Sequence, residues 1–308
     1  MELSQRVGYG AAFNNLTLND GKLVKEAKNG YGKAKLDKEL GFYQFLQKRN
    51  LSLSFPKILD ISDTSFVMPF YKDFVPFHTI FWKFPSEKQH VYIEKIRKEL
   101  DTLHASYTSP VSQDSLRVDL YEEGFAKVLR RYDEVRDILS HYDIEQVNGV
   151  TILSFERLME YIHEKILAAG QTLPPEYCLI HGDCQFSNLL YSQKDDSFLF
   201  VDPRGYFGKT DILGLPHYDS AKLLFALTGY DVFDSLLIDT LEIQEKNLIL
   251  PPIPILYETI QKVTFETILM ISIWLGNAHC FKQTPAKAAL SHFYARYIGT
   301  LVYISDRL

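Results

Sequence analysis

Two neighbouring stretches decide the fold of this chain: Tyr-Cys-Leu-Ile-His-Gly-Asp-Cys-Gln-Phe-Ser-Asn-Leu-Leu-Tyr at residues 177–191, and Ser-Phe-Leu-Phe-Val-Asp-Pro-Arg-Gly at residues 197–205. They predict three short apolar strands, separated first by a polar loop and then by a polar turn. This arrangement gathers three polar side chains at strand ends, namely Asp183, Asn188 and Asp202.

Two carboxylates and one amide in this order suit phosphoryl transfer, in which a protein places a hydroxyl in line with a γ-phosphate and neutralises charge. One carboxylate receives the hydroxyl proton, and Asp183 suits that role. An amide oxygen and a second carboxylate hold magnesium, a hard cation that prefers oxygen ligands, and Asn188 and Asp202 suit that role. The alternative is a surface β-hairpin with a solvated polar turn.

The run His181-Gly182-Asp183-x-x-x-x-Asn188 is followed by Asp202 and then by Tyr218-Asp219-x-Ala221-Lys222. These motifs resemble the aminoglycoside phosphotransferase and choline kinase group of small-molecule kinases. That group is similar in fold to protein kinases, whose catalytic loop H-R-D-x-x-x-x-N has the same spacing. The resemblance is close over residues 177–225 and diffuse elsewhere.

The resemblance implies an enzyme that uses ATP and Mg²⁺ to phosphorylate a hydroxyl of a small metabolite. It assigns catalysis to Asp183, with His181 and Asp219 holding the catalytic loop, and it places Asn188 at the nucleotide and the metal and Asp202 at the metal. For Asp219 the alternative is an acidic residue in the first turn of a helix, favoured by the helix dipole.

Residues 1–28 form strand-like segments broken by glycines, and Asn19-Asp20-Gly21 is typical of a hairpin turn. By the resemblance, this is the hairpin that covers the nucleotide, with residues 10–15 as its loop. A lysine on its second strand is then expected to meet the α- and β-phosphates. Lys25 is our expectation and Lys28 the alternative, because the period of two leaves the inward face undecided.

A helix is predicted from about Lys35 to Lys48, where apolar residues recur at three-to-four spacing. Glu39 lies on this helix and, by the kinase-like resemblance, orients the strand lysine at the nucleotide site. The alternative is that Glu39 is solvated and pairs with Lys35.

The length of 308 residues allows two lobes with separate cores. Strand-rich sequence gives way to helical patterns near residues 71–77. We therefore expect an α+β, bilobal, protein-kinase-like fold. Residues 1–72 form a small strand-rich nucleotide-binding lobe, and residues 73–308 form a larger, mostly helical lobe for catalysis and acceptor binding.

Three other residues near the motifs have two interpretations each. Arg204 lies in Asp-Pro-Arg-Gly, where a protein kinase has Asp-Phe-Gly, and it either pairs with a phosphate or carboxylate or bridges loops. His104 ends a run that resembles the Leu-His signature of the family, and we expect a structural histidine rather than a ligand. Cys184 lies in the catalytic loop, but a nucleophile would need a positioned base and a lowered pKa.

Composition excludes several classes of protein. The net charge of −6 gives no general attraction for nucleic acid or an anionic membrane. The first residues lack the apolar core of a signal peptide and the longest apolar run is too short to span a bilayer, so we expect a cytoplasmic protein. Three cysteines without C-x-x-C spacing argue against a zinc site or a disulfide scaffold.

The expected partner is a small hydroxylated acceptor, and its identity and the oligomeric state stay open. Choline, ethanolamine, an amino sugar or another sugar all fit the resemblance. One alternative function is phosphorylation of an aminoglycoside-type antibiotic. Another is a nucleotide-binding pseudokinase with a regulatory role, although a dead kinase is free to lose the set Asp183, Asn188 and Asp202.

Overall fold

The computed structural model describes residues 13–308, and the chain divides into two compact units. The first unit contains the chain up to Ser109 together with Tyr177–Asp219, and the second contains Pro110–Glu176 and Ser220–Leu308. Part of the expected nucleotide-covering loop at residues 10–15 falls in residues 1–12, outside the described residues. The units divide the chain at other points than residue 72, and the lobe boundary expected there stays a prediction.

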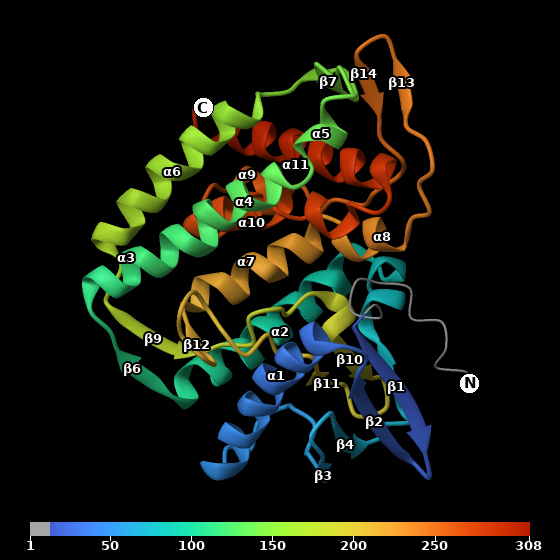
Figure 1. The fold of residues 1–308 in the computed structure, drawn as a ribbon, viewed down its shortest axis with the longest axis vertical. Coiled ribbons are helices and arrows are strands. Elements are labelled where there is room, and N and C mark those ends of the chain that lie inside the picture. Colours follow the sequence, from blue (N-terminus) through green and yellow to red (C-terminus); the bar gives the residue numbers. More distant parts are fainter. Residues whose placement is uncertain (1–12) are drawn as a thin grey trace. The chain divides into compact units, whose positions relative to one another are not determined.

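A four-stranded antiparallel sheet opens the first unit, in the order β1-β2-β4-β3 (Figure 1). Its strands are β1 (Asn14–Asn19), β2 (Lys22–Ala27), β3 (Asp60–Ile61) and β4 (Ser65–Pro69). Asp20 and Gly21 have φ angles of 45° and 72°, as the two central residues of a tight hairpin turn require. The hairpin predicted at Asn-Asp-Gly is therefore confirmed.

Helix α1 (Gly30–Lys48) follows the hairpin and packs against β2. It begins five residues before the predicted start at Lys35, because the Asn29 side chain caps it by accepting a hydrogen bond from the Gly32 amide at 2.8 Å. The first turn contains two glycines, which have low helix propensity, so propensity alone does not predict a helix start here. The buried face of α1 includes Glu39 and Tyr43.

Two three-stranded sheets and a long helix complete the first unit. One sheet has the order β11-β10-β5, and the other has the order β12-β9-β6. Their bounds are Phe74–Pro76 (β5), Thr108–Pro110 (β6), Glu176–Leu179 (β9), Leu189–Ser192 (β10), Ser197–Phe200 (β11) and Leu213–Gly214 (β12), and the helix is α2 (Ser86–Ser106). The three strands predicted around the polar loop are thus present as β9, β10 and β11.

The second unit is mainly helical, and its long helices α10 and α11 lie side by side (Figure 1). Its helices are α3 (Gln113–Tyr121), α4 (Lys127–Asp133), α5 (Arg136–Leu139), α6 (Phe155–Thr172), most of α7 (Pro216–Leu227), α8 (Tyr230–Ser235), α9 (Glu258–Gln261), α10 (Phe265–Leu275) and α11 (Pro285–Ser305). A small sheet has the order β13-β14-β7-β8, with bounds Glu242–Gln244, Asn247–Ile249, Gln146–Val147 and Val150–Thr151.

Aromatic residues of the late helices form core. Trp274 and Tyr294 are fully buried, their ring centroids lie 4.8 Å apart, and the Trp274 indole donates to the Thr228 hydroxyl at 2.8 Å. Burial with a satisfied indole N–H is typical of packing rather than of an open ligand cage. The high aromatic content of this region therefore serves stability.

The fold class is confirmed, since an N-terminal antiparallel sheet precedes a mostly helical C-terminal region. Among residues 13–308, none of the helices has the length and apolarity needed to span a membrane.

Candidate active site

The catalytic-loop candidate runs from the end of β9 to a short 3₁₀ turn at Phe186–Asn188, directly before β10. Gly182 has a φ of 76°, which favours glycine. A Cβ at Gly182 would also lie 2.8 Å from the Arg204 Cβ. The sharp bend after β9 therefore depends on the glycine of His-Gly-Asp.

Asp219 holds this loop from the first turn of α7. Its carboxylate accepts hydrogen bonds from two consecutive amides, His181 N–H at 2.9 Å and Gly182 N–H at 2.6 Å, and its side chain is fully buried. A buried carboxylate needs such donors, because desolvation of the charge is costly. These contacts support the expected loop-holding role, and the position at the start of a helix is compatible with it.

His104 at the end of α2 also contacts Asp219, with its Nε2 at 2.9 Å from the carboxylate. His104 is expected to be a structural histidine and is not among the predicted site residues. Its contact joins α2 to the residue that holds the catalytic loop. The Leu-His signature was the available signal, but spacing alone gives no partner for a residue 115 positions away.

His181 is fully buried and uses both ring nitrogens. Its Nδ1 accepts from the Asp183 amide at 3.1 Å, so Nε2 carries the hydrogen and donates to the Val201 carbonyl at 3.0 Å. Burial lowers the pKa of His181, although Asp219 and Asp183 oppose this shift. A neutral imidazole thus connects the catalytic loop to the residue before Asp202.

Asn188 is oriented by the loop that it ends. Its Nδ2 donates to the Asp183 carbonyl at 2.8 Å and to the Asp183 carboxylate at 3.1 Å. The amide oxygen is therefore the atom of Asn188 that can bind a cation. The Val201 amide donates to the Asn188 carbonyl at 3.0 Å, which places Asn188 beside the segment that carries Asp202.

Lys25 is only 5% exposed and lies between two carboxylates. Its Nζ is 2.6 Å from Glu39 Oε2 and 2.7 Å from Asp202 Oδ1. Lys28 is exposed one residue beyond the end of β2, and the Lys35 ammonium lies 4.8 Å from the Tyr31 ring centroid. Lys25 therefore lies on the buried face of β2 and pairs with Glu39, and its contact with a nucleotide stays a prediction.

Burial and charge act in opposite directions on this cluster. Burial alone would lower the pKa of Lys25, but Asp202 and Glu39 raise it above its usual value. Burial raises the pKa of Glu39 to about 7, and the Lys25 ammonium opposes this shift. One ammonium shared by two carboxylates leaves the cluster able to accept further positive charge.

The donor set fits magnesium. Asn188 offers an amide oxygen and Asp202 a carboxylate, which are the hard ligands that Mg²⁺ prefers, and Mg²⁺ usually keeps waters and phosphate oxygens in its remaining positions. Within residues 13–308 the structure has no cluster of three or more His, Cys, Asp or Glu side chains suited to a metal. Asn188 and Asp202 would thus be two protein ligands of a site whose other positions are filled by waters and phosphate oxygens.

The segment after Asp202 packs closely against α1. Gly205 has a φ of 68°, and a Cβ there would lie 2.3 Å from the Lys38 carbonyl oxygen. The Arg204 amide donates to the His181 carbonyl at 2.7 Å, and its guanidinium lies 3.9 Å from the Tyr206 ring centroid. These contacts favour the interpretation that Arg204 bridges loops.

Cys184 has a structural contact. Its buried thiol donates to the Asp219 carbonyl at 3.0 Å, so it packs against the start of α7.

Every predicted site residue contacts another one directly or through Val201, and their catalytic roles stay predictions.

We expect Gly205→Ala to destabilise the protein by about 2 kcal/mol or more, because left-handed strain and a backbone clash act together. Gly21→Ala is the matched control, since Gly21 has a φ of 72° but nothing within 4 Å of its added Cβ. Its expected loss is about 1 kcal/mol from strain alone. Urea unfolding of both variants measures the difference, and equal losses would contradict the close contact.

The His181 contribution to stability should depend on pH. The unfolded chain takes up this proton below about pH 6.5, whereas the folded pKa of His181 lies lower, so the contribution is full above that pH and lost as the pH falls. In His181→Gln, the free energy of unfolding should change less between about pH 7 and about pH 5. Urea unfolding across this range tests it, and parallel curves for wild type and variant would refute it.

The fold was compared with solved structures. LicA in complex with AMP matches with a TM-score of 0.51 and 16% identity, over 95% of this chain and 88% of that chain. Choline kinase LicA from Streptococcus pneumoniae matches with a TM-score of 0.48 and 14% identity, over 93% and 89%. A mutant of aminoglycoside 2′-phosphotransferase-IIIa in complex with GDP matches with a TM-score of 0.49 and 15% identity, over 96% and 88%.

No protein-family model and no curated protein matches the sequence. At 16% identity the match to LicA establishes the fold alone, and the resemblance that the motifs predicted is confirmed at the level of the fold. The chain therefore has the kinase-like α+β fold of the choline kinase LicA.

Proposed function

We propose that this protein is a kinase that transfers the γ-phosphate of ATP, with magnesium, to a hydroxyl of a small metabolite. The observation that carries the proposal is the buried Lys25 ammonium, bound by Glu39 at 2.6 Å and by Asp202 at 2.7 Å. A strand, a helix and the end of the β10–β11 hairpin each contribute one charged group to this cluster. Burying Lys25 and Glu39 beside the partly exposed Asp202 is costly, so stability alone is a weak reason for this cluster.

Each residue of the site has a role in this proposal. Asp183 receives the hydroxyl proton as the acceptor attacks, and the Asn188 amide holds its carboxylate in place. Asn188 and Asp202 hold magnesium, which when bound neutralises charge on the phosphates. Lys25 contacts the α- and β-phosphates, Glu39 orients Lys25, and the pair His181 and Asp219 fixes the loop.

The nucleotide and the acceptor belong to the same proposal. One matched structure contains AMP, and others contain ADP, ATP or GDP, which supports a nucleoside phosphate as the donor. Two of the matched structures are complexes with the aminoglycosides gentamicin and streptomycin. We propose an amino alcohol of the choline or ethanolamine type, or a sugar, as the acceptor class here.

A panel of acceptors tests the activity. Wild-type protein with ATP and magnesium should release ADP with at least one amino alcohol, sugar or aminoglycoside, and Asp183→Ala should lower this rate by about a hundredfold or more. A coupled ADP assay measures both proteins. Unchanged ATP binding by Asp183→Ala is the control for folding. If neither protein releases ADP while both bind ATP, the pseudokinase alternative replaces the proposal.

The role of Lys25 has its own test. Lys25→Ala should weaken ATP binding by about tenfold or more, because it removes a positive charge from the phosphates. Lys28→Ala removes an exposed lysine three residues away and should change the affinity by less than about twofold. Lys25→Arg keeps the charge and controls for the unpaired Glu39 that the alanine leaves. Titration calorimetry decides, and equal effects of both alanines would exclude Lys25.

A further inference from the structure

The segment between α1 and β3 contacts the catalytic loop at His181. Phe55 in this segment is 8% exposed, and its ring lies nearly parallel to the imidazole of His181, with centroids 5.9 Å apart and planes at 26°. Phe55 also lies 5.7 Å from Phe200, and Phe200 lies 5.8 Å from His181. Two phenyl rings therefore meet at the imidazole that joins the catalytic loop to Val201.

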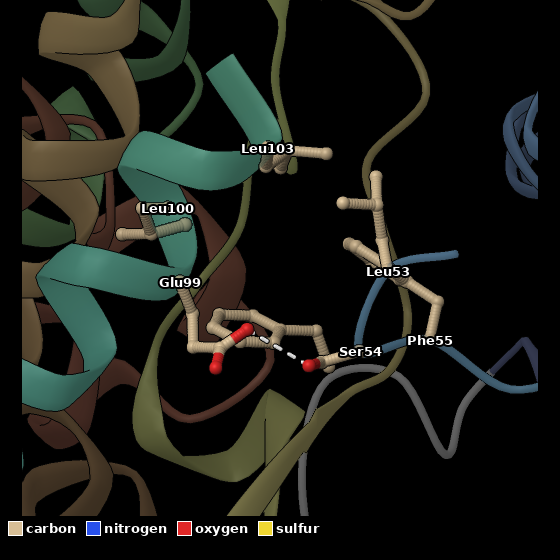
Figure 2. Close-up of a pocket in the computed structure, with 7 residues that line it drawn as sticks. Leu53, Ser54, Phe55, Glu99, Leu100 and Leu103 are labelled. Carbon is tan, nitrogen blue, oxygen red and sulfur yellow. Dashed lines mark hydrogen bonds between the residues drawn. The ribbon is translucent and has the colours of Figure 1, made fainter. Parts of the chain in front are cut away.

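Ser54 fixes Phe55 through two hydrogen bonds. Its carbonyl accepts from the Phe200 amide at 2.7 Å, and its hydroxyl donates to Glu99 Oε2 at 2.8 Å. Figure 2 shows the second bond, which joins the segment to α2 beside Leu100 and Leu103. The segment is thus tied both to the end of β11, two residues before Asp202, and to α2.

A small cavity lies at this junction, lined by apolar side chains that include Phe55, Leu100 and Phe200 (Figure 2). The edge of the Phe55 ring that faces this space has fewer neighbouring atoms to hold it. The position of the Phe55 ring therefore depends on the two bonds of Ser54 as well as on packing.

The orientation of His181 matters because its two nitrogens act on different backbone groups. Nδ1 accepts from the Asp183 amide and Nε2 donates to the Val201 carbonyl. Rotation of the ring away from this plane would break both bonds and release the proposed base and the residue beside Asp202. Phe55 lies against the imidazole and opposes that rotation.

We propose that Phe55 and Ser54 are positioning residues of the phosphotransferase site: Phe55 holds the plane of His181, and Ser54 anchors Phe55 to α2 and to the end of β11. Neither residue contacts the reacting groups. The inference rests on the proposed function for its kinetic consequence, but its structural part concerns only the state of His181.

The kinetic test compares Phe55→Leu with Leu100→Ala. Both remove apolar atoms from the same cavity wall, but only the first removes the ring on His181. Phe55→Leu should lower kcat by about tenfold, with KM for ATP changed by less than about twofold, because loop geometry rather than nucleotide binding is affected. Leu100→Ala should keep kcat within about twofold. Ser54→Ala should lower kcat in the same direction by a smaller factor.

A second test needs no activity. In ¹⁵N spectra of ring-labelled histidine, wild-type His181, assigned with His181→Gln, should show one protonated and one unprotonated nitrogen. Phe55→Leu should average these signals and speed hydrogen exchange at the Asp183 amide, whereas Leu100→Ala should not. Identical spectra and exchange in the two variants would overturn the inference. If no acceptor is phosphorylated, the proposed function fails, and these spectra still decide the role of Phe55.

Discussion

The ion pair of Lys25 with Glu39 and Asp202 is the constraint on which the rest of the site depends. A buried ammonium needs its negative partners at hydrogen-bonding distance, so β2, α1 and the end of the β10–β11 hairpin must keep their mutual positions. Gly205 contacts the backbone of α1 at Lys38 and Glu39. This contact places the segment after Asp202 beside the helix that carries Glu39, as the ion pair requires. Charge and close packing here enforce one geometry.

A second set of contacts, based on hydrogen bonds rather than charge pairs, controls the catalytic loop. Asp219 binds two consecutive amides, and neutral His181 joins Asp183 to Val201. Val201, whose carbonyl binds His181, directly precedes Asp202, so the catalytic loop is connected to the ion-pair cluster through adjacent residues. A change in the orientation of His181 would therefore affect both the proposed base Asp183 and the segment that carries Asp202.

Much of this arrangement was predictable from the sequence, because it depends on local patterns. The Asn-Asp-Gly turn, the strands around residues 177–200 and the grouping of Asp183, Asn188 and Asp202 follow from period and spacing. The burial of Lys25 rather than Lys28 was not predictable, since it depends on which face of β2 is covered by α1. The contacts of His104 and Phe55 were also not predictable from the sequence. Their partners, Asp219 and His181, are distant in sequence, and a single His or Phe is usually a core residue.

The tight approach of Gly205 to the Lys38 carbonyl has a consequence for inhibitor design. A compound could bind in a space that opens only when the segment after Asp202 is displaced. Such a compound would first have to separate two packed backbones, and this free-energy cost would reduce its affinity. Ligands that accept the observed conformation avoid this penalty. A screen for this protein should therefore favour compounds that compete with the nucleotide or the acceptor in the existing geometry.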